Sequence, residues 1–132
     1  MEAPTTNVLL LGLGELSRQR LETVFAKQGR DVHSRDFLSA GQCVGFIEQL
    51  SAGLVFCAAE PDRYRPLLDA VRHRPSPISV VVVGRPEVSA WLDALEAGAA
   101  DYCAPPFEDS HLYWIVQSAL KSRSLPQASA AA

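Results

Sequence analysis

The sequence predicts a single α/β domain built around a parallel β-sheet. Apolar runs of strand length alternate five times with segments of helical periodicity, and this alternation is typical of βαβ units. Two of the runs are almost purely aliphatic, which indicates strands covered on both faces. The chain has 132 residues, of which 48% are hydrophobic, so we expect one hydrophobic core and no second ordinary domain.

Five strands are expected from the apolar runs. The fourth contains four consecutive valines, the strongest β-branched run of the chain, so we expect it in the interior of the sheet. The second is short and mixed in polarity, which suits a strand at or near the sheet edge. The expected strands are residues 7–11, 30–34, 54–58, 78–83 and 101–103.

Five helices are expected between and after these strands. Pro61 and Pro86 precede the third and fourth helices, and Gly98 closes the fourth. Gly41 and Gly45 weaken the second helix. In the first helix the apolar residues Leu16, Leu21, Val24 and Phe25 are expected on the buried side. The expected helices are residues 15–28, 39–51, 63–73, 87–97 and 110–121.

These elements define a domain over residues 7–122, with residues 1–6 as an N-terminal extension. Residues 123–132 are expected to form a flexible tail or linker, because they are mainly small and polar.

Composition limits the partners and the compartment. A net charge of −3 and a pI of about 5.5 provide no basic face for phosphates, so we expect no direct nucleic-acid binding. No segment approaches the ~20 apolar residues needed to cross a bilayer, so we expect no membrane partner. Cys43, Cys57 and Cys103 are isolated in sequence, which favours a reducing, cytoplasmic environment.

The segment at residues 97–107, Ala-Gly-Ala-Ala-Asp-Tyr-Cys-Ala-Pro-Pro-Phe, contains a helix end, a short strand and a proline turn. It resembles the end of the receiver domain of bacterial response regulators, whose usual form is A-G-A-x-[DE]-[YF]-[LI]-x-K-P-F. The order of elements over residues 7–121 is similar to the same CheY-like family. The resemblance implies a three-layer, flavodoxin-like (βα)5 fold with a parallel five-stranded sheet in the strand order 2-1-3-4-5.

The resemblance also places the family's phosphorylation residues on side chains of a different chemistry. The acidic pair that holds magnesium in receivers falls on Gly12 and Leu13. The phosphoacceptor aspartate falls on Cys57, the hydroxyl residue that ends the fourth strand falls on Val83, and the lysine falls on Pro105. The chain is therefore similar to a degenerate receiver, or pseudo-receiver. For Cys57, a buried apolar role and a redox or metal role remain as alternatives.

A candidate contact face lies on the expected fourth helix, fifth strand and fifth helix. Tyr102 occupies the place of the aromatic switch residue of the family, and Trp91 points to the same side if the leucines that follow it face the core. Ile115 and Ser118 are expected on that side from the last helix. Such a cluster can anchor a protein partner or self-association, or its aromatic rings can simply cover the edge of the core.

A second hypothesis concerns a glycine-containing turn after the first strand. Gly12, Gly14 and Ser17 come close to the pattern G-x-G-x-x-G, and Asp36 lies about where a ribose-binding acid would be found. The third glycine is absent, however, so the glycines can equally fill the space of the lost acidic pair. This alternative predicts a nucleotide or small-ligand sensor at the carboxyl edge of the sheet.

Together these observations predict a pseudo-receiver of a bacterial two-component or transcription-regulatory protein that acts through protein–protein contact. We expect no enzymatic activity. A catalytic triad could be assembled from Ser17, Asp36 and His111, but the sequence lacks the nucleophile elbow that would support it. We expect no metal and no cofactor, since the three histidines show no ligand spacing.

Overall fold

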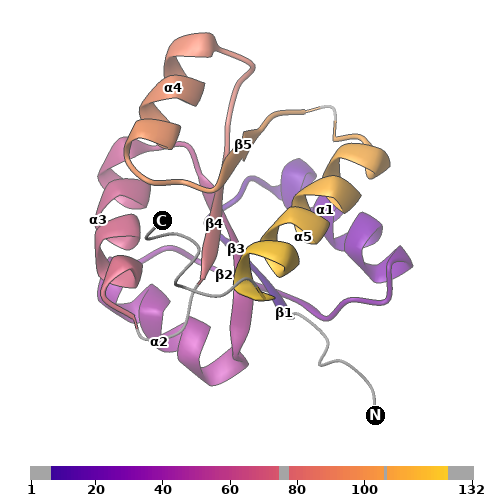
Figure 1. Cartoon of the computed structure of the whole chain (residues 1–132), viewed down its shortest axis with the longest axis horizontal. Helices are drawn as coiled ribbons and strands as arrows, with labels where there is room; N and C mark the ends of the chain where they lie inside the picture. Colours follow the sequence, from indigo (N-terminus) through magenta and orange to yellow (C-terminus); the bar gives the residue numbers. More distant parts are fainter. Residues whose placement is uncertain (1–6, 75–77, 106, 125–132) are drawn as a thin grey trace.

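The computed structural model describes residues 7–74, 78–105 and 107–124. Five parallel strands form one sheet in the order β2-β1-β3-β4-β5, which confirms the predicted flavodoxin-like α/β fold and strand order (Figure 1). The strands are β1 (Asn7–Leu11), β2 (Val32–Arg35), β3 (Ala52–Ala58), β4 (Ser79–Val83) and β5 (Asp101–Cys103). The helices are α1 (Glu15–Lys27), α2 (Ala40–Leu50), α3 (Pro61–Arg72), α4 (Val88–Glu96) and α5 (Asp109–Ser124).

Helices cover both faces of the sheet and create two core layers. Helices α1 and α5 cover one face, and helices α2, α3 and α4 cover the other (Figure 1). Alternate residues of each strand face opposite layers, so that Phe56 of β3 packs under α1 and α5 whereas its neighbour Val55 packs under α2 and α3. The Phe56 ring lies 5.4 Å from the Phe25 ring between centroids.

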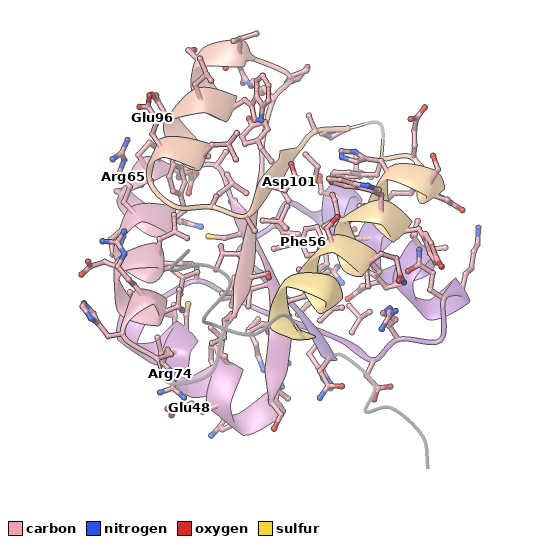
Figure 2. All side chains as sticks on the ribbon, viewed as in Figure 1. Glu48, Phe56, Arg65, Arg74, Glu96 and Asp101 are labelled. Carbon is pink, nitrogen blue, oxygen red and sulfur yellow. The ribbon has the colours of Figure 1, made fainter. Side chains whose placement is uncertain are left out.

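The second helix is secured at both ends despite its glycines. The N–H of Gln42 donates to the Ser39 hydroxyl oxygen at 3.2 Å, which satisfies one of the free donors at the helix start. Ser51 ends the helix in the left-handed conformation with φ of 51°. Glu48 near the end of α2 forms an ion pair with Arg74, which follows α3, so the two helices are linked at that end (Figure 2).

One helix face differs from its prediction. Leu16 is 83% exposed, whereas Leu21, Val24 and Phe25 are buried as expected. Leu16 precedes Leu21 by five residues, which corresponds to a rotation of about 140° around the helix axis. Leu16 therefore lies outside the buried face that Leu21, Val24 and Phe25 share.

Element boundaries differ from the predictions by a few residues. Strand β3 begins two residues earlier than expected, at Ala52, and α5 continues to Ser124, beyond the expected domain end at residue 122. Residues 1–6 and the greater part of the predicted tail lie outside the described residues. None of the helices in the described ranges combines the length and the apolar character that crossing a bilayer requires.

Candidate functional site at the carboxyl edge of the sheet

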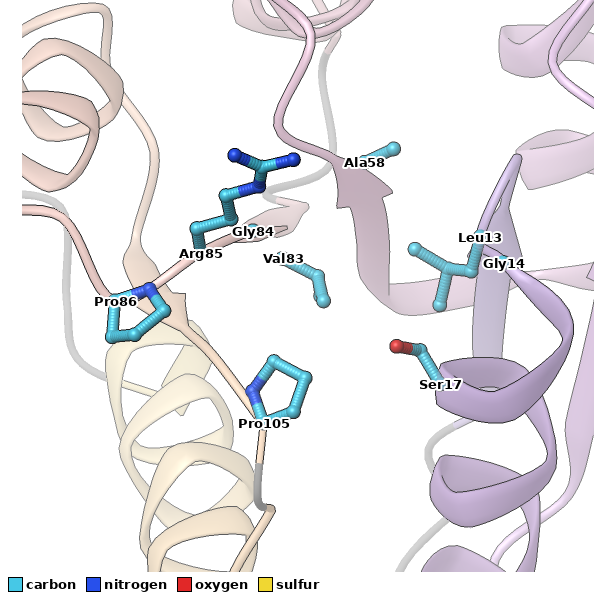
Figure 3. Close-up of a pocket in the computed structure, with 9 residues that line it drawn as sticks. All are labelled: Leu13, Gly14, Ser17, Ala58, Val83, Gly84, Arg85, Pro86 and Pro105. Carbon is cyan, nitrogen blue, oxygen red and sulfur yellow. The ribbon is translucent and has the colours of Figure 1, made fainter.

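A cavity of about 340 Å³ opens where the carboxyl ends of β1, β3, β4 and β5 meet, and we call it the carboxyl-edge hollow (Figure 3). Its apolar walls come from four segments of the chain, because parallel strands end at the same edge of the sheet. Two polar side chains, Ser17 and Arg85, also line it. The apolar lining residues are Leu13, Ala58, Val83, Pro86 and Pro105.

The structure brings together three of the five residues expected in the degenerate phosphorylation pocket. Leu13, Val83 and Pro105 line the carboxyl-edge hollow. Gly12 instead lines a neighbouring cavity. Cys57 is fully buried among the core residues under α2 and α3, and its neighbour Ala58 lines the hollow in its place.

The hollow has little to offer a divalent cation. Magnesium prefers carboxylate and other hard oxygen ligands in octahedral geometry, and none of the lining side chains carries a carboxylate. Within the residues that the structure describes, no group of three or more His, Cys, Asp or Glu side chains could hold a metal ion.

The environment of Cys57 favours an apolar role over a redox role. Burial, reinforced by the nearby Cys43, raises the pKa of the Cys57 thiol from 9.0 to about 12. The thiolate is the reactive form of cysteine, and this environment keeps the group a neutral thiol at physiological pH. The Cys103 thiol is similar, since burial raises its pKa to about 12 as well.

Tyr102 is fixed against the loop that joins β4 to α4. Its hydroxyl donates to the Arg85 carbonyl oxygen at 2.6 Å, and the side chain is only 8% exposed. Gly84 makes this position possible, because a Cβ there would lie 2.4 Å from both the Tyr102 hydroxyl oxygen and the Ala59 Cβ. Burial also raises the pKa of Tyr102, so the hydroxyl remains a donor. These contacts favour the interpretation in which the ring does not move.

A second cavity of about 200 Å³ lies beside α4, and we call it the Trp91 groove. It is lined by Pro86, Glu87, Val88, Trp91 and Tyr102, so that Pro86 belongs to the groove and to the carboxyl-edge hollow. Trp91 is 43% exposed, and Val88 is also exposed.

The other two residues of the predicted contact face lie elsewhere. Ile115 is 2% exposed and belongs to the core under α5, so its side chain cannot supply a contact surface. Ser118 lines a separate cavity of about 90 Å³ together with Ile115 and the exposed Trp114, so these two predicted residues meet each other but not the Trp91 groove. The expectation that leucines of α4 face the core is wrong for Leu92, which is exposed because α4 buries its small residue Ala94 instead.

The residues of the predicted nucleotide-binding turn are divided between two cavities. Gly14 and Ser17 line the carboxyl-edge hollow, whereas Gly12 and Asp36 line the neighbouring cavity of about 400 Å³. Asp36 therefore shares its cavity with Gly12 and with Arg18 of α1, and it does not line the hollow that Gly14 and Ser17 line.

Sequence reasoning missed the chemical contribution of the β4–α4 loop. Arg85 supplies the only cationic side chain of the hollow among its described lining residues, and Pro86 connects the hollow with the Trp91 groove. Their position directly after an interior strand was the signal available, since that is where parallel sheets gather functional groups.

The sequence matches no protein-family model and no curated protein. Solved structures nevertheless share its fold. A Chloroflexus aurantiacus protein described as a response regulator is 23% identical, with a TM-score of 0.76 and coverage of 89% of this chain and 99% of that chain. A CheY-like protein (tadZ) from Pseudomonas aeruginosa is 22% identical, with a TM-score of 0.75 and coverage of 87% and 99%.

The beryllofluoride-activated NtrC4 receiver domain dimer is a third structure of this fold. It is 16% identical, with a TM-score of 0.73 and coverage of 89% of this chain and 98% of that chain. At these identities the likeness establishes the shared receiver fold.

Proposed function

We propose that this chain is a non-enzymatic, receiver-like signalling domain that acts by protein contact and does not use aspartyl phosphorylation. The observation that carries the proposal is the apolar lining of the carboxyl-edge hollow. Leu13, Val83 and Pro105 meet there, where the resemblance expects an acid, a hydroxyl and an ammonium group.

The chemistry of phosphoryl transfer supports this proposal. The reaction needs an acceptor oxygen, and it needs metal ions or cations that neutralise the transferred group. At the place of the acceptor, Cys57 carries a thiol that is buried in the other core layer. Among the described residues, the lining of the hollow supplies no carboxylate for magnesium, and Arg85 is its single cation.

Incubation of the full chain with acetyl phosphate and magnesium tests this part of the proposal. We expect no increase in intact mass, while a receiver that has the complete set of acidic and lysine residues gains a phosphoryl group in a parallel sample. The intact mass should be the same before and after acid treatment, and the melting temperature should be unchanged. Formation of an acid-labile phosphoryl adduct on this chain would falsify the proposal.

The same proposal assigns protein contact to the surface around the Trp91 groove. Trp91, Val88 and Leu92 expose apolar area on one helix, and exposed aromatic rings beside a cavity are the usual anchors of interfaces. The NtrC4 receiver domain, which is similar in fold, forms a dimer in its beryllofluoride-activated form. A second copy of this chain is therefore the first partner to test.

Sedimentation velocity over a range of protein concentrations tests the contact surface. We expect Trp91→Ser to weaken self-association, because it removes the ring that borders the groove. Leu16→Ser is the matched control, since it removes an apolar side chain that is even more exposed than Trp91, from α1 in the opposite layer. Equal behaviour of the two variants would contradict the assignment of the surface.

A further inference from the structure

We infer that the carboxyl-edge hollow binds a small carboxylic acid with an apolar body. Arg85 would hold the carboxylate, and the walls formed by Leu13, Val83 and Pro105 would contact the apolar part. This inference rests on the proposed loss of phosphoryl chemistry from the same hollow.

The size and lining of the hollow suit a small organic ligand. Its volume of about 340 Å³ lies within the range of ligand sites, which are mostly apolar and contain a few convergent polar groups. Figure 3 shows the side chains of Leu13, Val83, Pro105 and Ser17 facing one another across the hollow, with the Ser17 hydroxyl directed inward. In the same view the Arg85 guanidinium is directed away from Ser17 and Pro105, toward the side of the hollow on which Ala58 lies (Figure 3).

The charges around the hollow favour an anion. No acidic side chain lines it, and among the described residues Arg85 forms no ion pair. Many other arginines of the chain are already paired with carboxylates, namely Arg18, Arg20, Arg63, Arg72 and Arg74. Glu87, the nearest acid along the chain, lines the Trp91 groove and not this hollow. A guanidinium presents a planar pair of donors that matches a carboxylate.

The balance of polar and apolar groups distinguishes a carboxylic acid from a phosphate or a nucleotide. A phosphate would face one cation and one hydroxyl, and it would gain nothing from five apolar walls. A nucleotide would need a partner for its ribose, but Asp36 lies in the neighbouring cavity. A carboxylate on a hydrocarbon body uses both kinds of lining.

The hollow is connected with the proposed contact surface through the β4–α4 loop. The Arg85 carbonyl accepts the hydrogen bond from Tyr102, and Pro86 lines both the hollow and the Trp91 groove. A ligand held by the Arg85 side chain would therefore stiffen the segment that forms one wall of the groove, which gives it a route to influence protein contact.

Amide NMR titration of the full chain tests the inference with four probes: benzoate, hexanoate, benzamide and inorganic phosphate. We expect saturable shifts with the two carboxylates at Gly14, Ser17 and the β4–α4 loop. Benzamide, which has the shape of benzoate without its charge, should bind about tenfold more weakly. Phosphate should cause no saturable shift.

Two arginine variants supply the matched comparison. Arg85→Gln should weaken benzoate binding about tenfold, because it removes the charged donors from the hollow. Arg65→Gln should leave binding unchanged, because Arg65 is exposed on α3 and does not line the hollow (Figure 2). Both side chains are exposed, so neither variant should impair folding, and circular dichroism checks this.

Three results would overturn the inference: no saturable shift with either carboxylate, equal benzoate binding by wild type and Arg85→Gln, or tighter binding of phosphate than of benzoate. The phosphodonor experiment separates this outcome from the proposed function. Benzoate binding together with a phosphoryl adduct would refute only the proposed function, whereas absence of both would refute only the ligand site.

Discussion

A methyl group on Gly84 would lie 2.4 Å from both the Ala59 Cβ and the Tyr102 hydroxyl oxygen, well inside van der Waals contact. We expect Gly84→Ala to lower the free energy of unfolding by about 1–3 kcal/mol, the usual cost of overpacking. Urea denaturation measures the effect. Gly45→Ala is the control, because its Cβ would meet nothing within 4 Å and alanine favours the helix, so that variant should be stabilised by up to about 1 kcal/mol.

If Gly84→Ala is as stable as wild type, the Tyr102 ring must have another position available. The fixed hydrogen bond to the Arg85 carbonyl would then be a poor description of this residue in solution.

The buried thiols predict a loss of stability at alkaline pH. Burial raises the pKa of Cys57 and Cys103 from 9.0 to about 12. Above pH 9.0 the unfolded chain releases these protons while the native chain retains them. The free energy of unfolding is therefore unaffected by the thiols below that pH, and it falls as the pH rises toward about 12. The expected slope is about 1 kcal/mol per pH unit for each thiol.

Urea denaturation on both sides of the ordinary thiol pKa measures this dependence. Cys57→Ala should lose part of the slope, although its stability at neutral pH is lower because it leaves a small cavity. If Cys57→Ala keeps the full wild-type dependence of the free energy of unfolding on pH, then Cys57 ionises in the native chain as readily as in the unfolded chain.

Among the helices, α2 depends most visibly on its cap, because Gly41 and Gly45 reduce its intrinsic stability. We expect Ser39→Ala to lower the free energy of unfolding by about 1 kcal/mol, since the Gln42 N–H loses its acceptor. Ser39→Asp retains an acceptor and should remain close to wild type. Thermal denaturation followed by circular dichroism compares the variants, and unchanged stability of Ser39→Ala would mean that the cap contributes nothing.

The β4–α4 loop contributes both to the packing of β5 and to the two proposed binding surfaces. It follows an interior strand, receives the Tyr102 hydrogen bond through Arg85 and contributes Pro86 to two cavities. Side chains on this segment should therefore affect ligand binding and protein contact together, unlike exposed residues on α1 or α3.

For the whole molecule, the two core layers share one sheet and should unfold together. Phe56 supports the layer under α1 and α5 and is fully buried. We expect Phe56→Ala to lower the free energy of unfolding by about 3–5 kcal/mol. Because β3 is the central strand, both layers should lose the same stability.

The two tryptophans make this testable, because Trp91 lies on α4 and Trp114 on α5, in opposite layers. In the single-tryptophan variants Trp114→Phe and Trp91→Phe, fluorescence should report the same unfolding midpoint as circular dichroism, with or without Phe56→Ala. Two separate midpoints would contradict a single cooperative unit.

The elements and their order could be predicted because they depend on local patterns. These patterns act over a few residues, so they can be recognised in the sequence alone: apolar runs of strand length, Pro61 at the start of a helix, Pro86 before one and Gly98 after one. The receiver resemblance at residues 97–107 then supplied the strand order, which local patterns do not contain.

Tertiary structure alone decided which side chains share a space. Leu13 and Pro105 are distant in the sequence and meet because β1 and β5 end at the same edge, whereas Cys57 turns to the other layer through the alternation of its strand. Packing likewise buried Ile115 and exposed Leu16, two outcomes that depend on where each helix touches the sheet. The sequence by itself therefore determined the scaffold, while only the folded chain decided that Arg85 borders an apolar hollow, because long-range packing assembles that surface.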